Sequence, residues 1–240
     1  IANPSVDSIC FDLEDSVAAA QKPAARGLVS DALEQAQELK AERCVRLNSL
    51  RTPYFEDDIS TILQSPFLDT LVMPKVESAS DVHHVAQLLD KAASKNVRII
   101  ASLESGKAIM FAREIAAASP RLSALLFAAE DYCASVGIQR TFSRSELYFA
   151  RSVTVNAAKA YGLQAIDMVC IAYQDLAVLA DESEEGSRMG FDGKQAIHPA
   201  QIDTIQGSYS PSEADISRAV GILERNAAAE EAGQGAFGLN

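Results

Sequence analysis

The chain has 240 residues, of which 48% are hydrophobic and 22% charged, values typical of one globular domain with a sizeable core. Its 12 glycines and 8 prolines are too few for a linker-rich or collagenous chain. The net charge of −12 and the absence of a Lys/Arg run argue against a nucleic-acid partner and against an anionic membrane surface. No apolar stretch is long enough to span a bilayer, and the four cysteines form no Cys-x-x-Cys pair. We therefore expect an intracellular globular protein with reduced, buried thiols.

Short apolar runs alternate with longer amphipathic segments along the chain. Seven runs are rich in Val, Ile, Leu and Phe without polar alternation, which is typical of parallel strands covered on both faces. They span residues 8–12, 44–48, 70–74, 98–104, 124–128, 166–171 and 195–198. The intervening segments predict helices, among them 23–40, 82–95, 143–161 and a last one that starts at 210–213. The pattern indicates repeated strand–helix units and therefore an α/β fold.

Repeated strand–helix units form either a doubly wound sheet or a (β/α)8 TIM barrel. The chain has no Gly-x-Gly-x-x-Gly after its first strand and no Gly-x-x-x-x-Gly-Lys-Ser/Thr motif, which disfavours a nucleotide-binding sheet. A barrel needs eight strands, whereas the sequence predicts seven. We therefore expect a barrel whose first strand lies before Ile1, so that the strands ending at Asp12 and His198 flank a gap. The barrel domain with its C-terminal helix is expected over 1–232 and a linker-like tail over 233–240.

Ionisable residues follow almost every predicted strand. In an α/β barrel the active site is built on the carboxyl ends of the strands. A single carboxylate before a helix is usually a cap, but six strands ending this way predict convergence on one site. The residues concerned are Asp12, Glu14, Asp15, Arg46, Asn48, Lys75, Glu77, Glu104, Glu130, Asp131 and the turn at Ile197 and His198.

The residue types in this group favour a metal site and an anionic substrate. Converging carboxylates repel each other unless a cation lies among them, and oxygen ligands without His or Cys favour Mg²⁺ before Zn²⁺. Arg46 offers a planar fork to a substrate carboxylate. A metal, an arginine and carboxylates together suit an α-keto or α-hydroxy acid head, with a C–C bond broken or formed beside it.

Other polar residues receive structural interpretations. His83 and His84 are interpreted as solvated helix residues, and the acidic stretch 181–185 as an exposed helix face. Ser102 and Ser105 have no histidine in the same motif, which gives a Ser/His/Asp hydrolase little support.

Six motifs, in order along nearly the whole chain, resemble signatures of the citrate lyase β-subunit-like family of metal-dependent barrel aldolases. They are FDLEDSV at 11–17, VRLN at 45–48, MPKVES at 73–78, LESG at 103–106, AED at 129–131 and GKQAIHP at 193–199. The segments 162–168 and 189–194 most resemble the branch that contains the mitochondrial citramalyl-CoA lyase.

The resemblance implies residue roles. Glu104 and Asp131 would be the Mg²⁺ ligands, and Glu14, Asp15 and Arg46 would be catalytic residues around the metal and its water network. Arg46 and Lys75 would bind the substrate, and the backbone around Ile197 and His198 would contact the acyl-CoA. The acid/base residue would lie in a segment after Asn240 that reaches a neighbouring subunit's site, so a homo-oligomer, most simply a trimer, is expected.

The activity implied by the resemblance is a Mg²⁺-dependent carbon–carbon lyase reaction. A 3-hydroxyacyl-CoA of the citramalyl-CoA or malyl-CoA type would be cleaved to acetyl-CoA and a 2-oxo acid such as pyruvate, or formed by the reverse condensation. Two alternatives stay open: a free 2-oxo acid aldolase that uses no CoA, and a subunit of a citrate lyase complex. The compartment would be the mitochondrial matrix in a eukaryote and the cytoplasm otherwise.

Overall fold

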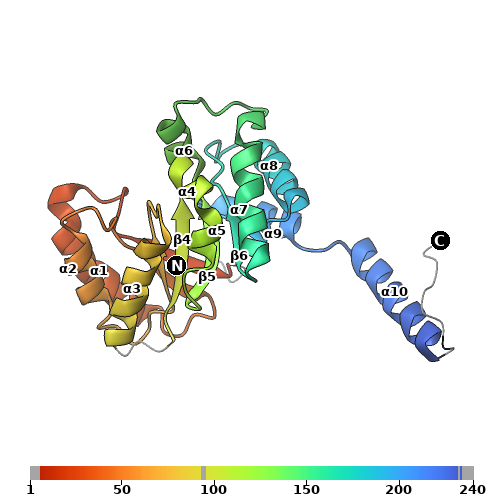
Figure 1. The fold of residues 1–240 in the computed structure, drawn as a ribbon, viewed down its shortest axis with the longest axis horizontal. Helices are drawn as coiled ribbons and strands as arrows, with labels where there is room; N and C mark the ends of the chain where they lie inside the picture. The colour runs from red at the N-terminus through yellow and green to blue at the C-terminus, as the bar shows by residue number, and fades with distance from the viewer. Residues whose placement is uncertain (1–5, 93–95, 232, 234–240) are drawn as a thin grey trace.

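The computed structural model describes residues 6–92, 96–231 and 233. Its strands form one all-parallel sheet in which spatial order follows chain order (Figure 1). The strands are β1 (Ser8–Asp12), β2 (Glu42–Arg46), β3 (Thr70–Met73), β4 (Arg98–Leu103), β5 (Leu122–Phe127), β6 (Gln164–Asp167) and β7 (Gly193–Lys194). The sheet curls, and a hydrogen bond of 2.7 Å from Gln206 Nε2, in the helix after β7, reaches Asp7 Oδ2 just before β1.

Helices cover the outside of the curled sheet in chain order (Figure 1). They are α1 (Lys22–Gln35), α2 (Phe55–Ile62), α3 (Ala79–Lys91), α4 (Gly106–Met110), α5 (Ala112–Ala116), α6 (Ala129–Val136), α7 (Tyr148–Ala160), α8 (Leu176–Met189), α9 (Ile202–Tyr209) and α10 (Glu213–Glu231). Short 3₁₀ helices occupy Ala19–Gln21, Ser145–Leu147 and Pro199–Gln201. Figure 1 shows α10 projecting away from the body on an extended connection. None of these helices is long and apolar enough to cross a membrane.

Both faces of the sheet are apolar, which explains why the strand sequences do not alternate. The outward face packs against the helices and contributes Leu71, Ile99 and Leu125 to the large core. The inward face holds a smaller cluster that includes Val72 and Ile100. Strands covered on both sides read as continuous hydrophobic runs, as the sequence predicted.

The predicted strand number and parallel order are confirmed, but a closed barrel is not shown. Within the described residues β1 and β7 are not paired with each other, so the sheet is an open, curled half-barrel. The last strand was expected at 195–198, and this boundary is wrong. Gln201 Oε1 accepts the backbone N–H groups of Ile197 (2.8 Å) and His198 (3.3 Å), which removes two donors that a strand would need.

Two expectations about side chains are also wrong. The acidic stretch 181–185 is exposed only in part: the side chains of Asp181 and Glu184 are exposed, whereas Glu182 and Glu185 are buried and pair with arginines. All four cysteines are free, as expected, but Cys10 is exposed while the other three are buried. Cys10 lies on β1, which has a strand neighbour on one side only within the described part of the sheet.

Candidate active site

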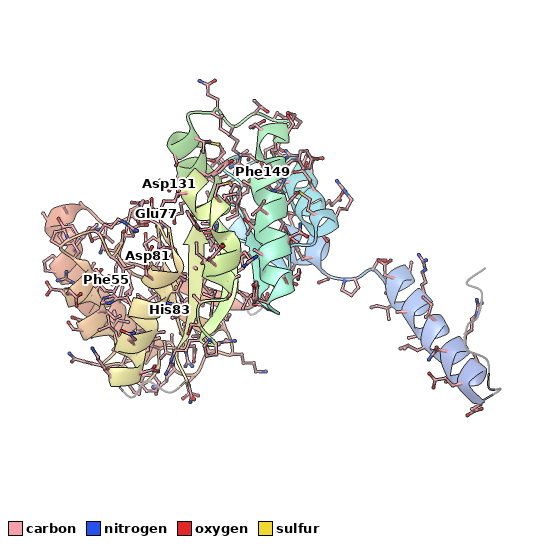
Figure 2. All side chains as sticks on the ribbon, in the orientation of Figure 1. Phe55, Glu77, Asp81, His83, Asp131 and Phe149 are labelled. Carbon is pink, nitrogen blue, oxygen red and sulfur yellow. The ribbon has the colours of Figure 1, made fainter. Side chains whose placement is uncertain are left out.

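The carboxyl ends of the parallel strands bring the predicted polar residues to one end of the molecule. Asp12 and Arg46 are the last residues of β1 and β2, Lys75 lies two residues after β3, and Glu104 directly follows β4. In Figure 2, Glu77 and Asp131 lie beside the tip of β4, and His83 lies toward the opposite end of the molecule. The arrangement is the one expected for a site built on strand ends.

Arg46 is held by two carboxylates. Its Nε donates to Asp12 Oδ1 and its Nη2 to Asp12 Oδ2, both at 2.7 Å, and its Nη1 lies 3.0 Å from Glu14 Oε2. Burial opposes ionisation of Asp12, but the hydrogen bonds from Arg46 and Ser16 outweigh it and hold the pKa of Asp12 well below its usual range. A guanidinium carries five N–H groups, so Arg46 keeps one N–H on Nη1 and one on Nη2 for a further acceptor.

Glu14 lies between two cations and is only 4% exposed. Its Oε1 accepts from Lys75 Nζ at 2.6 Å, and its Oε2 faces Arg46. Burial raises the pKa of Glu14, although the two cations oppose the rise. The backbone of Lys75 has a φ of 52°, a left-handed conformation that is unusual outside glycine. The next acid, Asp15, is exposed, and its Oδ1 lies 3.6 Å from Lys75 Nζ. Glu14 and Asp15 therefore differ in burial, although the sequence analysis gave them the same role.

Glu104 is a buried acid of the group whose pKa is strongly raised. It is 4% exposed, and burial together with the negative charges of Glu14 and Asp131 raises its pKa to about 7. The Ser102 side chain and the backbone N–H of Lys75 oppose this rise by hydrogen bonding to the carboxylate. Asp131, in the first turn of α6, is thus within electrostatic reach of Glu104. Two acids held near each other in a buried place are a candidate cation site.

The donor set of this place fits Mg²⁺. No group of three or more His, Cys, Asp and Glu residues with metal-binding geometry occurs among the described residues. Glu104 and Asp131 would therefore supply only two protein oxygens. Mg²⁺ is commonly bound through one or two carboxylates, with water or substrate oxygens completing its octahedron.

The turn at Ile197 and His198 is held by the buried side chain of Gln201. Besides accepting the two N–H groups of the turn, Gln201 donates from Nε2 to the Cys170 carbonyl at 3.1 Å. The backbone N–H groups expected to contact acyl-CoA are thus already bonded. The side chains of the turn are exposed and remain available to a ligand. The centroid of the His198 ring lies 5.5 Å from that of the Tyr173 ring.

Sequence reasoning missed two supports of the site. Lys22 is buried and donates to the carbonyls of Leu13 and Glu14, both at 2.9 Å, which fixes the loop that carries Glu14. Asp12 was noted as a strand end, but its bidentate bond to Arg46 was not foreseen. The sequence did contain a signal for the Asp12–Arg46 contact. The two residues lie near the ends of consecutive predicted strands, and such strands pair side by side in a parallel sheet.

Comparison with known proteins decides the family. The model of the HpcH/HpaI aldolase/citrate lyase family matches residues 2–199. The chain belongs to this family. The resemblance inferred from the motifs is thereby confirmed, and so is the expectation of a lyase.

Relatives and solved structures of the family cover most of the chain. A citrate lyase subunit beta-like protein of Deinococcus radiodurans is 38% identical over 96% of this chain and 81% of its own length. The human mitochondrial citramalyl-CoA lyase is 35% identical over 99% of this chain and 74% of its own. The protein CitE of Mycobacterium tuberculosis, solved with magnesium, acetoacetate and coenzyme A, has a TM-score of 0.75 and 30% identity, covering 98% of this chain and 83% of that one.

Proposed function

We propose that this family member is a Mg²⁺-dependent carbon–carbon lyase acting on a CoA thioester. The proposed reaction cleaves a 3-hydroxyacyl-CoA of the citramalyl-CoA or malyl-CoA type to acetyl-CoA and a 2-oxo acid such as pyruvate, and the same site can run the condensation. The observation that carries the proposal is Glu104, a buried carboxylate with a pKa raised to about 7 by burial and by the charges of Glu14 and Asp131. The solved relative with magnesium and coenzyme A supports the same assignment.

In this proposal Glu104 and Asp131 hold the cation. When bound, Mg²⁺ would stabilise the negative charge on the hydroxyl oxygen as that oxygen loses its proton, and would help to hold the carboxylate of the oxo-acid part. The electrostatic coupling of the two carboxylates supports this pairing.

The neighbouring cations bind and orient the substrate. The free N–H groups on Nη1 and Nη2 of Arg46 can donate to a substrate carboxylate beside Asp12, and Lys75 adds positive charge at the same edge. Glu14 accepts a hydrogen bond from Lys75 at Oε1 and forms an ion pair with Arg46 at Oε2, so we assign it the role of holding Arg46 and Lys75 apart and in place. Asp15, which is exposed, would contribute through the water network.

The cleavage needs a base for the hydroxyl proton. In the proposed reaction that proton leaves the hydroxyl oxygen, its electrons form the carbonyl of the 2-oxo acid, and the C–C bonding pair passes into the thioester as an enolate. Protonation of this enolate at carbon gives acetyl-CoA. We assign this proton transfer to a residue of a neighbouring subunit in a homotrimer, an arrangement implied by the family resemblance.

The same proposal includes the complete fold and the location. Two open edges, on β1 and β7, support an eight-stranded barrel closed by a strand from outside the described residues. Residues up to 232 would form that one barrel domain.

CoA thioesters as substrates favour an intracellular site, in the mitochondrial matrix or the cytoplasm. Light scattering during gel filtration measures the subunit number, and a catalytically active monomer would contradict the trimer.

The test of function is a substrate panel. Malyl-CoA, citramalyl-CoA and citryl-CoA are incubated with the purified protein, with Mg²⁺ or with EDTA, and acetyl-CoA and the 2-oxo acid are measured. We expect Mg²⁺-dependent cleavage of at least one ester and thermal stabilisation by CoA esters. Cleavage of free 2-oxo acid aldols without any effect of CoA would favour the free aldolase. Activity that appears only with added citrate lyase subunits would favour the complex subunit, a role that the Deinococcus relative's name suggests.

A further inference from the structure

A buried ion cluster lies behind the candidate site, between α6 and α8. Its central side chain is Arg140, which is 8% exposed and makes three contacts. Nη1 lies 2.6 Å from Glu130 Oε1 and 3.1 Å from the Val169 carbonyl, and Nη2 lies 2.8 Å from Glu182 Oε1. Arg140 thus joins the first turn of α6, the chain after β6 and the helix α8.

The α8 end of this connection is firmly held. The Glu182 side chain is 6% exposed, and its Oε2 lies 3.3 Å from Nζ of the buried Lys194 on β7. Arg144 Nη1 lies 4.0 Å from the same carboxylate. A buried carboxylate that accepts from Arg140 and lies 3.3 Å from the Lys194 ammonium has little freedom to follow a moving partner, so Glu182 is the anchor for Arg140.

The α6 end carries the candidate metal ligand. Glu130 and Asp131 are consecutive residues in the first turn of α6, a helix of eight residues. The cap residue before this helix is Ala128, and no side chain caps the first turn. The Glu130 side chain is 51% exposed and could be solvated by water, yet it bonds Arg140. Gly137, with a φ of 72°, ends α6 in a left-handed conformation, and the chain beyond it brings Arg140 back to the first turn.

A stability role alone explains this arrangement poorly. Buried ion pairs often contribute little net stability, because removing both charges from water costs about as much as their attraction returns. Residues that orient metal ligands from behind are, in contrast, worth about 10- to 100-fold in metal affinity or activity. The α6 turn needs such orientation, since two protein oxygens from different elements must meet at one ion.

We propose that Arg140 is a positioning residue: through Glu130 it fixes the first turn of α6, and so holds the Asp131 carboxylate where it can share a divalent cation with Glu104. This inference rests on the proposed metal site. The arginine contacts no candidate ligand itself, and its effect passes through the backbone of the turn.

The test measures Mg²⁺ binding by isothermal titration calorimetry on the folded, metal-free protein, well below its Tm. Arg140→Gln and Glu130→Gln should each raise the Kd for Mg²⁺ by about tenfold, and the double variant should be no worse than either single one. Arg140→Lys should bind Mg²⁺ with intermediate affinity, because an ammonium cannot reach both carboxylates. Amide hydrogen exchange in the first turn of α6 should quicken in the metal-free Arg140→Gln and Glu130→Gln variants.

Arg144→Gln is the matched control. Arg144 is equally buried and carries the same charge, but its hydrogen bonds go to Glu185, Asp181 and the Phe142 carbonyl, and it reaches Glu182 only at 4.0 Å. Its substitution should lower stability and leave the Mg²⁺ Kd within twofold of the original. Because Glu130 is half exposed, Glu130→Gln tests the idea even if Arg140→Gln fails to fold.

Three results would overturn the inference in different ways. If Asp131→Asn abolishes Mg²⁺ binding while Glu130→Gln and Arg140→Gln leave it unchanged, the metal site stands and the positioning role is wrong. If Asp131→Asn leaves Mg²⁺ binding unchanged, the proposed metal site itself is wrong, and the positioning role falls with it. Equal loss of affinity in Arg140→Gln and Arg144→Gln would indicate a general stability effect and would also contradict the proposal.

Discussion

Substituting Glu104 by glutamine should stabilise the metal-free protein at alkaline pH. The folded-state pKa of Glu104 is about 7, against 4.5 for an ordinary glutamate. Because the folded pKa is raised, the folded state loses stability relative to the unfolded one as the pH rises from about 4.5 through about 7. At about 1.36 kcal/mol per pKa unit, the penalty reaches roughly 3 kcal/mol above pH 7. Glutamine has nearly the same shape and no charge, so Glu104→Gln removes the penalty.

The assay is urea unfolding in EDTA at several pH values between 5 and 8. We expect the unfolding free energy of Glu104→Gln to exceed that of the original protein by up to roughly 3 kcal/mol at pH 8, with the gap closing toward pH 5. Glu184→Gln, at a residue whose side chain is 61% exposed, is the control and should show no such gap. Saturating Mg²⁺ should reverse the order, because the cation stabilises the ionised carboxylate and the glutamine variant gains little.

The reasoning would be refuted by a Glu104→Gln variant that is less stable than the original protein at pH 8 in EDTA. Two pH profiles that run parallel from pH 5 to 8 would refute it as well, since they would show that Glu104 does not titrate in this range in the folded protein. Either result would also remove the main physical argument for a cation beside Glu104.

The other predictions concern single side chains. Arg46→Lys should lower kcat/KM tenfold or more while the unfolding free energy falls by about 1 kcal/mol, because a bidentate fork becomes a point charge; unchanged kinetics with a large fall in Tm would indicate a purely structural pair. Gly186→Ala should lower the unfolding free energy by several kcal/mol, because the new Cβ would collide with the Tyr209 hydroxyl. Gly27→Ala, in an open position within α1, should instead raise it by about 0.5–1 kcal/mol, and denaturation of both variants checks the contrast. Arg151→Leu should cost about 3–5 kcal/mol by the same measurement, since it removes the hydrogen bonds to both oxygens of the buried Asp167 carboxylate.

Local sequence patterns determined the parts of this protein that depend on neighbouring residues. Continuous apolar runs marked the strands, because a strand covered on both faces has no polar side, and the strand count and parallel order followed. The strand ends then located Glu14, Arg46, Glu104 and Asp131, since all strands of a parallel sheet end at the same edge. The motifs at those ends were sufficient to indicate the family.

Only the tertiary structure decided which distant groups meet. Asp12 and Arg46 are 34 residues apart, and Arg140 and Glu182 are 42 apart, so no local period relates them. The acidic stretch around Glu182 has the composition of a solvated face, yet Glu182 and Glu185 are buried because arginines from other segments neutralise them. The end of β7 was likewise misplaced, because one side chain in the following helix competes for the backbone donors of the expected strand. The energies of these ion pairs and hydrogen bonds depend on distances in space, and the pattern of apolar residues along the chain carries no information about those distances.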